Sequence, residues 1–391
     1  MKIGMVLDKT FPPDPRVHNE AIELIKSGHE VFLFCLTYGN EPTSELVGKI
    51  KVKRYESNKL EYKLSALAYT IPLYSLSLKK KIIHFLNKYD IEAIHIHDMV
   101  VAEAVMLANK KKQLPVVLDL HENRPEIMRF YPHLKKFPQN ILISTNKWKQ
   151  KEEELIKKAS KVIVVTQEAK EEVYKRTKIK SDKVIVVPNT VRKSFFEKQD
   201  NFEESSKRDT FNLLYIGDTG ERRGVATAIK SLPALKKEIE NIRLVIVGSL
   251  NTKLKKLSEE LKVEEQVCFE GWQEETTFPK YIKQSNVCLS PLHRNLHHDT
   301  THANKLFQYM SLRKPLLVSD ATAQKNIVEK VNAGLIHEAK NVEDFTDKVL
   351  RLYKDELLRK ELGKNGEAFI RNEFTWDKTS KELINLYNSL I

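Results

Sequence analysis

The chain of 391 residues has few cysteines, which secreted domains use for disulfide bonds, and lacks the long apolar runs that anchor membrane proteins. Its three cysteines lie in strand-like runs, and so sparse and odd a number predicts buried free thiols in a reducing compartment: Cys35, Cys268 and Cys288. No apolar run has the length that a bilayer span requires. The first run, which ends at Asp8, is too short for a signal peptide. We therefore expect a cytoplasmic protein.

The sequence also lacks an Asp-x-Asp pair, the carboxylates that usually hold a magnesium diphosphate. Histidines do gather in two places, but neither makes a convincing metal site. His95 and His97 end one strand without a clear third ligand. The second group suits anion contact or loop structure better: His297, His298, Asp299 and His302. We therefore expect no metal and no bound cofactor.

Positive charge is abundant and unevenly distributed. The net charge is +13, and residues 1–200 carry 36 Lys and Arg against 25 Asp and Glu, a balance of +11. Such a basic half suits an anionic partner, for example a phospholipid surface or a lipid diphosphate. A set of solvated lysine-rich helix faces explains the charge equally well. No basic motif with interleaved aromatics is present, so nucleic acid is not expected as a partner.

Short apolar runs alternate with amphipathic helices along the whole chain, which predicts two parallel α/β domains. The first domain is expected over residues 1–192, with strands at 3–7, 31–36, 91–96, 116–118, 162–165 and 184–187. A polar stretch, 193–210, has the character of a linker. The second domain is expected over 211–372, with strands at 211–216, 244–247, 267–269, 287–289 and 316–318. Residues 373–391 are expected to form a terminal helix.

Three stretches of the second half begin near the ends of strand-like runs and are therefore expected to meet at one edge of a sheet: 217–224, 271–291 and 297–320. Ligands of open α/β folds collect at that edge, and glycine turns let backbone amides approach a diphosphate. Two cations of these turns, Arg223 and Lys305, suit the same ligand. The glycine spacing differs from the dinucleotide fingerprint, which disfavours a nicotinamide enzyme.

The segment from Thr300 to Met310 predicts a helix start at this edge. Thr301 suits the N-cap, Lys305 lies one turn further on, where it could reach a phosphate, and Gln308 could reach a ribose hydroxyl. The alternative is that Lys305 and Gln308 form an ordinary exposed helix flank.

Polar residues at strand ends of the first half point to an acceptor region. His121 and Glu122 follow a buried strand, where His121 could hydrogen-bond a reacting substrate. A histidine bonded to a neighbouring loop is the alternative. Asp14 and Arg16 follow the first strand and could lie near an acceptor, although Asp14 could equally cap the helix that follows.

Two stretches of the first half are candidates for membrane contact. Residues 64–78 contain no charge and are flanked by lysines, but they include Pro72 and are too short to span a bilayer. A buried core helix is the slightly preferred interpretation of this stretch. The basic stretch 135–161, which contains Trp148, is the second surface candidate.

Taken together, these motifs resemble those of the retaining glycosyltransferases of the family 4 (group 1) type, which have the GT-B fold. The resemblance covers essentially the full length and depends on five groups of residues: Asp14–Ala21 with Gly28–Val31, Asp119–Glu122, Val187–Asn189, Gly217–Gly224, and Asn304–Met310 with Lys314 and Asp320. It implies two Rossmann-like domains whose parallel sheets face each other across a cleft. The second domain would bind a nucleotide sugar and the first an acceptor, and the last helix would cross back to the first domain.

The resemblance also assigns roles to individual residues. Arg223 matches a cation that contacts the diphosphate, and Lys305 with Asn304 matches the helix start that faces it. His121 matches a histidine near the reacting sugar. The remaining donor contacts would come from Gly217, Arg222, Gly224, Gly271, Trp272, Thr300, Thr301, His302 and Gln308, and the acceptor contacts from Asp14, Arg16 and Glu122.

The chain departs from the family pattern at several of these positions. Thr300 and Gln308 stand where the family has two glutamates, and Asp218 stands where a cation is usual, although Arg222 could replace that cation. Pro12 and Pro13 replace a glycine pair. These departures affect the donor site and leave the fold pattern intact.

The expected function is transfer of a hexose-type sugar from a UDP- or GDP-sugar to a glycan or lipid-linked acceptor. We expect the transfer to retain the configuration at the anomeric carbon and to need no metal. We also expect a role in bacterial cell-surface polysaccharide synthesis. A position on the inner face of the membrane would suit the basic first domain. Two alternatives stay open: a degenerate nucleotide-sugar-binding scaffold, and a nucleotide-sugar epimerase, for which Glu122 is the one obvious acid–base carboxylate.

Overall fold

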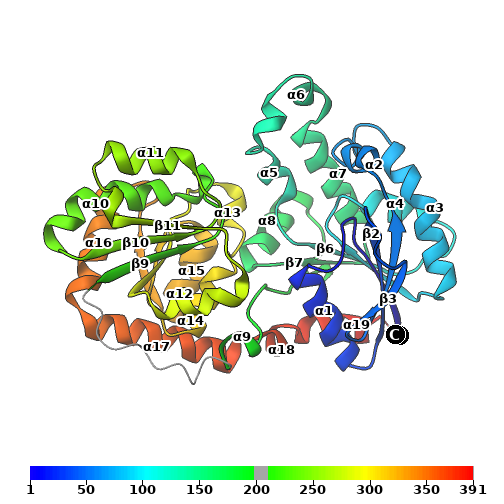
Figure 1. The fold of residues 1–391 in the computed structure, drawn as a ribbon. Helices are drawn as coiled ribbons and strands as arrows, with labels where there is room; N and C mark the ends of the chain where they lie inside the picture. Colours follow the sequence, from blue (N-terminus) through cyan, green and yellow to red (C-terminus); the bar gives the residue numbers. More distant parts are fainter. Residues whose placement is uncertain (198–209, 391) are drawn as a thin grey trace. The chain divides into compact units, whose positions relative to one another are not determined.

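The computed structural model describes residues 1–197 and 210–390 and divides the chain into two compact units (Figure 1). The first unit contains residues 1–188 together with 380–391, and the second contains 189–379. Most of the predicted linker, 193–210, lies outside the described part of the chain, because residues 198–209 are not described. Its first residues form the short helix α9 (Ser194–Glu197) of the second unit.

The first unit is built on an eight-stranded sheet with the order β3-β4-β2-β1-β5-β6-β7-β8. Its strands are β1 (Lys2–Val6), β2 (Glu30–Thr37), β3 (Ser44–Val47), β4 (Ile50–Glu56), β5 (Ala93–His97), β6 (Val116–Leu120), β7 (Lys161–Val164) and β8 (Val184–Val186). All neighbours are parallel except β3 and β4, which pair antiparallel at the edge. The sequence prediction missed this hairpin because β3 is largely exposed and polar residues interrupt β4, so neither shows a continuous apolar run.

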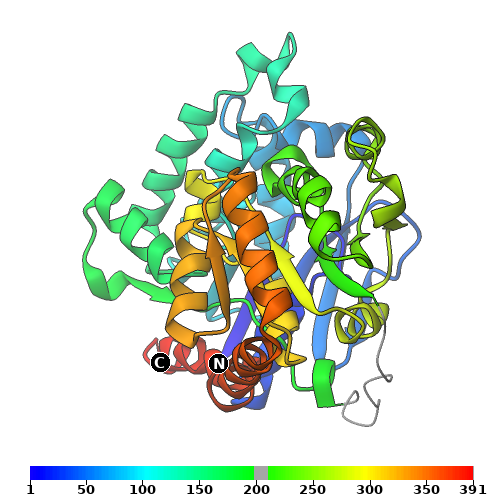
Figure 2. The ribbon, with the colours of Figure 1, turned by 90° about the vertical axis from the view of Figure 1, so that its left-hand side faces the viewer.

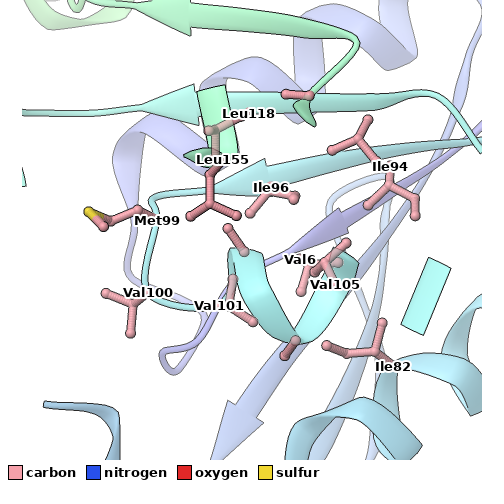
Figure 3. Packing of buried hydrophobic residues seen from close by; sticks show 14 of the residues in the cluster. Val6, Ile82, Ile94, Ile96, Met99, Val100, Val101, Val105, Leu118 and Leu155 are labelled. Atoms are coloured by element: carbon pink, nitrogen blue, oxygen red, sulfur yellow. The ribbon is translucent and has the colours of Figure 1, made fainter. Parts of the chain in front are cut away.

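Helices cover both faces of the first sheet. One face packs on α3 (Leu73–Lys88), α4 (Ala102–Asn109), α7 (Thr145–Lys158) and α8 (Gln167–Thr177). Figure 3 shows this contact, with Ile94, Ile96 and Leu118 of the strands beside Val105 of α4. The other side carries α1 (Pro15–Lys26) and α19 (Lys381–Asn388), which contact each other. Three short helices complete the unit: α2 (Lys59–Ser65), α5 (Arg124–Met128) and α6 (Gln139–Leu142).

The second unit is built on a six-stranded, fully parallel sheet with the order β11-β10-β9-β12-β13-β14. Its strands are β9 (Phe211–Ile216), β10 (Ile242–Val247), β11 (Val267–Gly271), β12 (Val287–Ser290), β13 (Leu316–Ser319) and β14 (Gly334–His337). Since β9, β11 and β12 belong to this parallel sheet, the turns that follow them lie at the same edge, as the sequence pattern predicts.

Alternate residues of these strands point to two separate cores. Leu213, Tyr215 and Leu289 pack against α10 (Val225–Glu238), α11 (Thr252–Glu260) and α16 (Val342–Lys354). Figure 2 shows α16, in orange, with α10, in green, beside it. Leu214 and Val318 face α12 (Phe278–Lys283), α14 (Lys305–Ser311), α15 (Thr322–Val331) and part of α17 (Glu356–Glu373). Two single turns, α13 (Leu296–Asp299) and α18 (Trp376–Thr379), complete the unit.

Two helix predictions are wrong in detail. The uncharged stretch 64–78 is not one buried helix, because α2 ends at Ser65 and α3 begins only at Leu73, after Pro72. The terminal helix expected over residues 373–391 is divided into α18 and α19, and only residues from Ser380 onward belong to the first unit. All three cysteines are free, as predicted, but only Cys35 and Cys288 are buried, and Cys268 is partly exposed. Among the described residues, no helix combines the length and apolar character needed to cross a membrane.

Candidate functional site

The turn after β9 brings backbone segments of the second unit unusually close together. Gly217 has φ of 131°, and its N–H donates to the carbonyl of Val247 at 2.8 Å. Gly224 has φ of 74° at the start of α10, and a Cβ there would lie 1.7 Å from the carbonyl oxygen of Pro291. Only glycine fits this position, so the turns after β9 and β12 can meet.

Arg222 is held in place by histidines of the turn after β12. Its Nη1 lies 2.9 Å from Nε2 of His298, and its carbonyl accepts the N–H of His293 at 2.9 Å. Burial lowers the pKa of His298 to about 4, so its ring is neutral. Nδ1 of His298 lies 2.7 Å from the carbonyl of His293 and donates to it, which leaves Nε2 to accept from Arg222.

Arg223 is partly exposed and faces an acid of its own turn. Its Nε donates to Oδ2 of Asp218 at 3.2 Å. Asp218 in turn accepts the N–H of Gly220 at 3.0 Å. The acid that departs from the family pattern therefore neutralises part of the charge of Arg223.

Lys305 is the least ordinary residue at this edge. Its side chain is only 8% exposed, and Nζ lies 3.6 Å from the ring centroid of Tyr215. Burial lowers the pKa of Lys305 well below its usual range, and the positive charge of Arg223 lowers it further. Burial and the second cation make this amine costly to charge, and an anion at this place would relieve that cost.

The helix that carries Lys305 begins later than the sequence suggests. Thr301 is not its N-cap, because the hydroxyl of Thr301 donates backward to the carbonyl of His297 at 2.7 Å. The hydroxyl of Thr300 likewise donates to Leu296 at 2.7 Å. Both threonines thus close the short helix α13, and α14 begins at Lys305, with Asn304 at the cap position.

The exposed-flank interpretation of Lys305 and Gln308 is also wrong. Gln308 is 7% exposed, and its amide donates to Oε1 of Glu275 at 2.8 Å. Glu275 comes from the turn before α12, and no sequence motif connects it with Gln308. An exposed carboxylate is therefore held beside the position where the family has a glutamate.

The remaining predicted donor contacts differ in exposure and in hydrogen-bond partners. Gly271 has φ of 70°, and Trp272, which follows it, is 73% exposed. Nε2 of His302 lies 3.1 Å from the carbonyl of Ala323 at the start of α15. Asp299 accepts the N–H of Thr322 at 2.8 Å, so this part of the histidine cluster serves the loop structure.

In the first unit, Arg16 is buried and does not lie at an open surface. Its Nε and Nη2 donate to the two oxygens of Asp119 at 2.9 and 2.7 Å, and Nη2 also lies 2.8 Å from Glu20. Its Nη1 donates to the carbonyl of Val187 at 3.1 Å. Arg16 thus ties α1 to the ends of β6 and β8. Asp14 caps α1 by accepting the N–H of Val17 at 3.1 Å, which fits the capping interpretation.

His121 lies at the end of β6 between two carboxylates. Its Nε2 is 2.8 Å from Oδ2 of Asp119, and its Nδ1 is 3.8 Å from Oδ2 of Asp98. Burial lowers the pKa of His121, but the two carboxylates outweigh burial and raise it to about 9. The ring is therefore an imidazolium at neutral pH and donates hydrogen bonds rather than accepting protons. Glu122, next along, lies 3.5 Å from Arg124, and burial raises its pKa.

Beneath His121, the structure gathers a buried polar cluster that the sequence only half revealed. Ligand atoms of Glu20, His95, His97 and Asp119 all lie within 4.8 Å of one another. The spacing is that of a candidate metal site, and the two carboxylates come from α1 and β6. The guanidinium of Arg16 lies against both carboxylates and the imidazolium of His121 lies 2.8 Å from Asp119, so two positive charges already face the two carboxylates. Tyr387 of α19 completes it, with its hydroxyl 2.9 Å from Nδ1 of His95.

The raised pKa of His121 makes a testable contribution to stability. Because the pKa rises from 6.5 to about 9 on folding, the contribution is full below 6.5 and disappears as pH rises through about 9. We expect His121→Asn to cost roughly 2–3 kcal/mol of unfolding free energy at pH 6 and much less above pH 9. Urea unfolding across this range measures the difference. His133→Asn, at an exposed ring, is the control and should change little at any pH.

Two sequence models of glycosyltransferase families match consecutive parts of the chain. The one described as Glycosyltransferase Family 4 matches residues 16–195, and the one described as Glycosyl transferases group 1 matches residues 196–369. The chain is 25% identical to an uncharacterized glycosyltransferase of Methanocaldococcus jannaschii, over 99% of this chain and 98% of that protein. It is 23% identical to the capsular polysaccharide biosynthesis glycosyltransferase CapM of Staphylococcus aureus, over 60% of this chain and 62% of CapM.

Solved structures share the architecture at lower identity. Sucrose-phosphate synthase from Thermosynechococcus elongatus matches with a TM-score of 0.77 and 17% identity, over 100% of this chain and 98% of that one. HepE of Anabaena, in complex with UDP and glucose, matches with a TM-score of 0.71 and 14% identity over the full length of both chains. The chain therefore belongs to the group 1 glycosyltransferases and has the GT-B fold.

Proposed function

We propose that this glycosyltransferase moves a hexose-type sugar from a nucleoside-diphosphate sugar to a glycan or lipid-linked acceptor, with retention at the anomeric carbon. The observation that carries the donor class is Lys305, a buried amine whose nearest influences are an aromatic ring and the cation Arg223. A diphosphate supplies the negative charge that this arrangement favours. HepE, which shares the fold, was solved in complex with UDP and glucose, the two parts of such a donor.

Charge stabilisation would come from the second unit. As the bond to the leaving diphosphate breaks, negative charge grows on its oxygens, and Arg223 and Lys305 would stabilise that charge. Arg222, fixed by His298, is the second guanidinium of the same turn. The leaving phosphate would take the proton of the acceptor hydroxyl on the same face of the sugar, so no protein base and no metal ion is required by this scheme.

The nucleoside would lie beside β11 and α14. The exposed ring of Trp272 and the turn at Gly271 suit a base, and the carboxylate of Glu275, held by Gln308, suits ribose hydroxyls. Asn304 lies at the start of α14, beside Lys305. Thr300 and Thr301 use their hydroxyls inside the protein, so their contribution would be to shape the turn before α14.

His121 would orient the sugar as a hydrogen-bond donor, because its imidazolium has no lone pair with which to act as a base. Asp119 and Arg16 act through it as positioning residues. Glu122, beside Arg124, remains the candidate for an acceptor contact. The similarity to CapM favours polysaccharide synthesis as the setting.

A thermal-shift screen against UDP, GDP and common nucleotide sugars tests the donor class. A ligand present at about 100 times its dissociation constant stabilises the folded protein by about 2.7 kcal/mol, a measurable rise in Tm. We expect one nucleotide family to produce this rise, and Lys305→Met to abolish it while leaving the Tm without ligand close to that of the parent. A screen in which no nucleotide raises Tm would contradict the proposal. Saturable binding without transfer to any acceptor would favour the degenerate-scaffold alternative instead.

A further inference from the structure

Large apolar side chains are exposed at one end of the first unit, on two segments that are far apart in the sequence. One segment is α6 with the residues just before it. Phe137, which precedes α6, is 78% exposed, and within the helix Ile141 is 70% and Leu142 is 41% exposed. The other is the turn into α3, where Ile71 is 37% and Leu73 is 53% exposed. Five large apolar residues on one face of a protein mark an interaction surface rather than ordinary exposure.

The two segments contact each other directly. The hydroxyl of Thr70 donates to the carbonyl of Leu142 at 2.7 Å. Beneath them, the ring of Tyr69 packs edge-on against buried Trp148, with centroids 4.8 Å apart. A hollow of about 360 Å³ opens beside Ile71, lined also by Lys147 of α7. Figure 1 shows α6 projecting from this end of the unit. Phe137, Ile141, Leu142, Ile71 and Leu73 together are named the α6 surface below.

The two segments that carry the α6 surface have an excess of positive charge. Residues 127–151 contain six Lys and Arg and no Asp or Glu, and residues 62–89 contain five Lys and no Asp or Glu. Lys135, Lys136 and Lys147 are exposed beside the apolar residues. The two acids that line the hollow, Glu103 and Glu154, both pair with Lys151, at 2.8 and 2.9 Å.

We propose that the α6 surface docks on an anionic lipid bilayer. Apolar side chains at a protruding tip can enter the boundary between headgroups and acyl chains, and the exposed lysines beside them complement anionic headgroups. Lys135, Lys136 and Lys147 are exposed positive charges next to the apolar residues, which favours lipid headgroups over a protein surface of mixed charge. The inference stands apart from the sugar-transfer proposal, because it depends on neither donor nor acceptor.

Flotation with vesicles tests the proposal, using the full chain without donor. We expect binding to vesicles of equal parts phosphatidylglycerol and phosphatidylcholine at low salt, weaker binding at high salt, and little binding to phosphatidylcholine alone. Lys135→Glu with Lys136→Glu should lower the partition coefficient at least about tenfold, since each lysine near such a surface contributes about fivefold. Phe137→Ser with Ile141→Ser should lower it by a similar factor.

Matched variants on the second unit serve as controls. Lys237→Glu with Lys330→Glu makes the same change in net charge, and Leu357→Ser removes another exposed apolar side chain. These variants should bind vesicles like the parent, and every variant should keep the parent's Tm because each substituted side chain is exposed. Equal loss in the control variants would overturn the proposal in favour of general charge attraction. If the parent does not bind vesicles but forms a dimer, and Phe137→Ser with Ile141→Ser dissociates that dimer, the proposal is overturned in favour of a protein interface. Neither outcome would affect the sugar-transfer proposal.

Discussion

Arg223→Ala should lower kcat/KM for sugar transfer by about 2–4 kcal/mol, or roughly 30- to 1000-fold. The reason is that the guanidinium would face charge that develops only as the sugar–phosphate bond breaks, so its removal raises the barrier more than it weakens ground-state binding. We therefore expect most of the loss in kcat. A steady-state assay with the nucleotide sugar found in the thermal-shift screen provides the measurement.

Arg243→Ala is the matched control, because Arg243 lies on β10 of the same unit with an exposed side chain. That variant should transfer sugar at the parent rate. Arg223→Lys should recover part of the loss, since the charge returns without the planar donor geometry. An Arg223→Ala enzyme with unchanged kcat/KM would remove this residue from the proposed chemistry, and a loss confined to KM would reduce its role to uniform binding.

Arg16→Leu should lower the free energy of unfolding of the first unit by about 3–5 kcal/mol. The side chain neutralises Asp119 and Glu20 inside the protein, at 2.7 and 2.8 Å, and its removal leaves two buried carboxylates without their guanidinium. Hydrogen exchange followed peptide by peptide is the suitable measurement, because it reports each unit separately. Protection should fall in β6 and α1, whereas peptides of the second unit should exchange as in the parent.

Arg129→Leu is the control for this prediction. Arg129 is also paired, with Glu126 at 3.0 Å, but its side chain is 49% exposed, so water replaces the lost partner. We expect a change within about 0.5 kcal/mol. Unchanged protection of β6 in Arg16→Leu would contradict the structural role of Arg16. It would also return Arg16 to consideration as an acceptor contact, the role that the sequence first suggested.

Much of the fold was readable because parallel strands covered on both sides produce continuous apolar runs. β9 and β12 each lie close to their predicted positions. The hairpin β3–β4 was missed because a sheet edge that faces water lacks that signal. The late start of α14 was missed for another reason. A threonine hydroxyl that caps a helix and one that donates back to the preceding turn look alike in a sequence.

The sequence by itself determined the class of protein, the two α/β units and the edge of the second sheet at which Arg223 and Lys305 lie. Only the tertiary structure decided the state of these side chains. Burial and the nearby cation Arg223 make the charge of Lys305 costly, and Glu275 approaches Gln308 from a separate turn. It also moved Arg16 from an expected surface contact to the buried partner of Asp119, beneath His121. Local patterns report which residues a strand or helix exposes, but burial and charge pairing depend on neighbours brought together from distant parts of the chain.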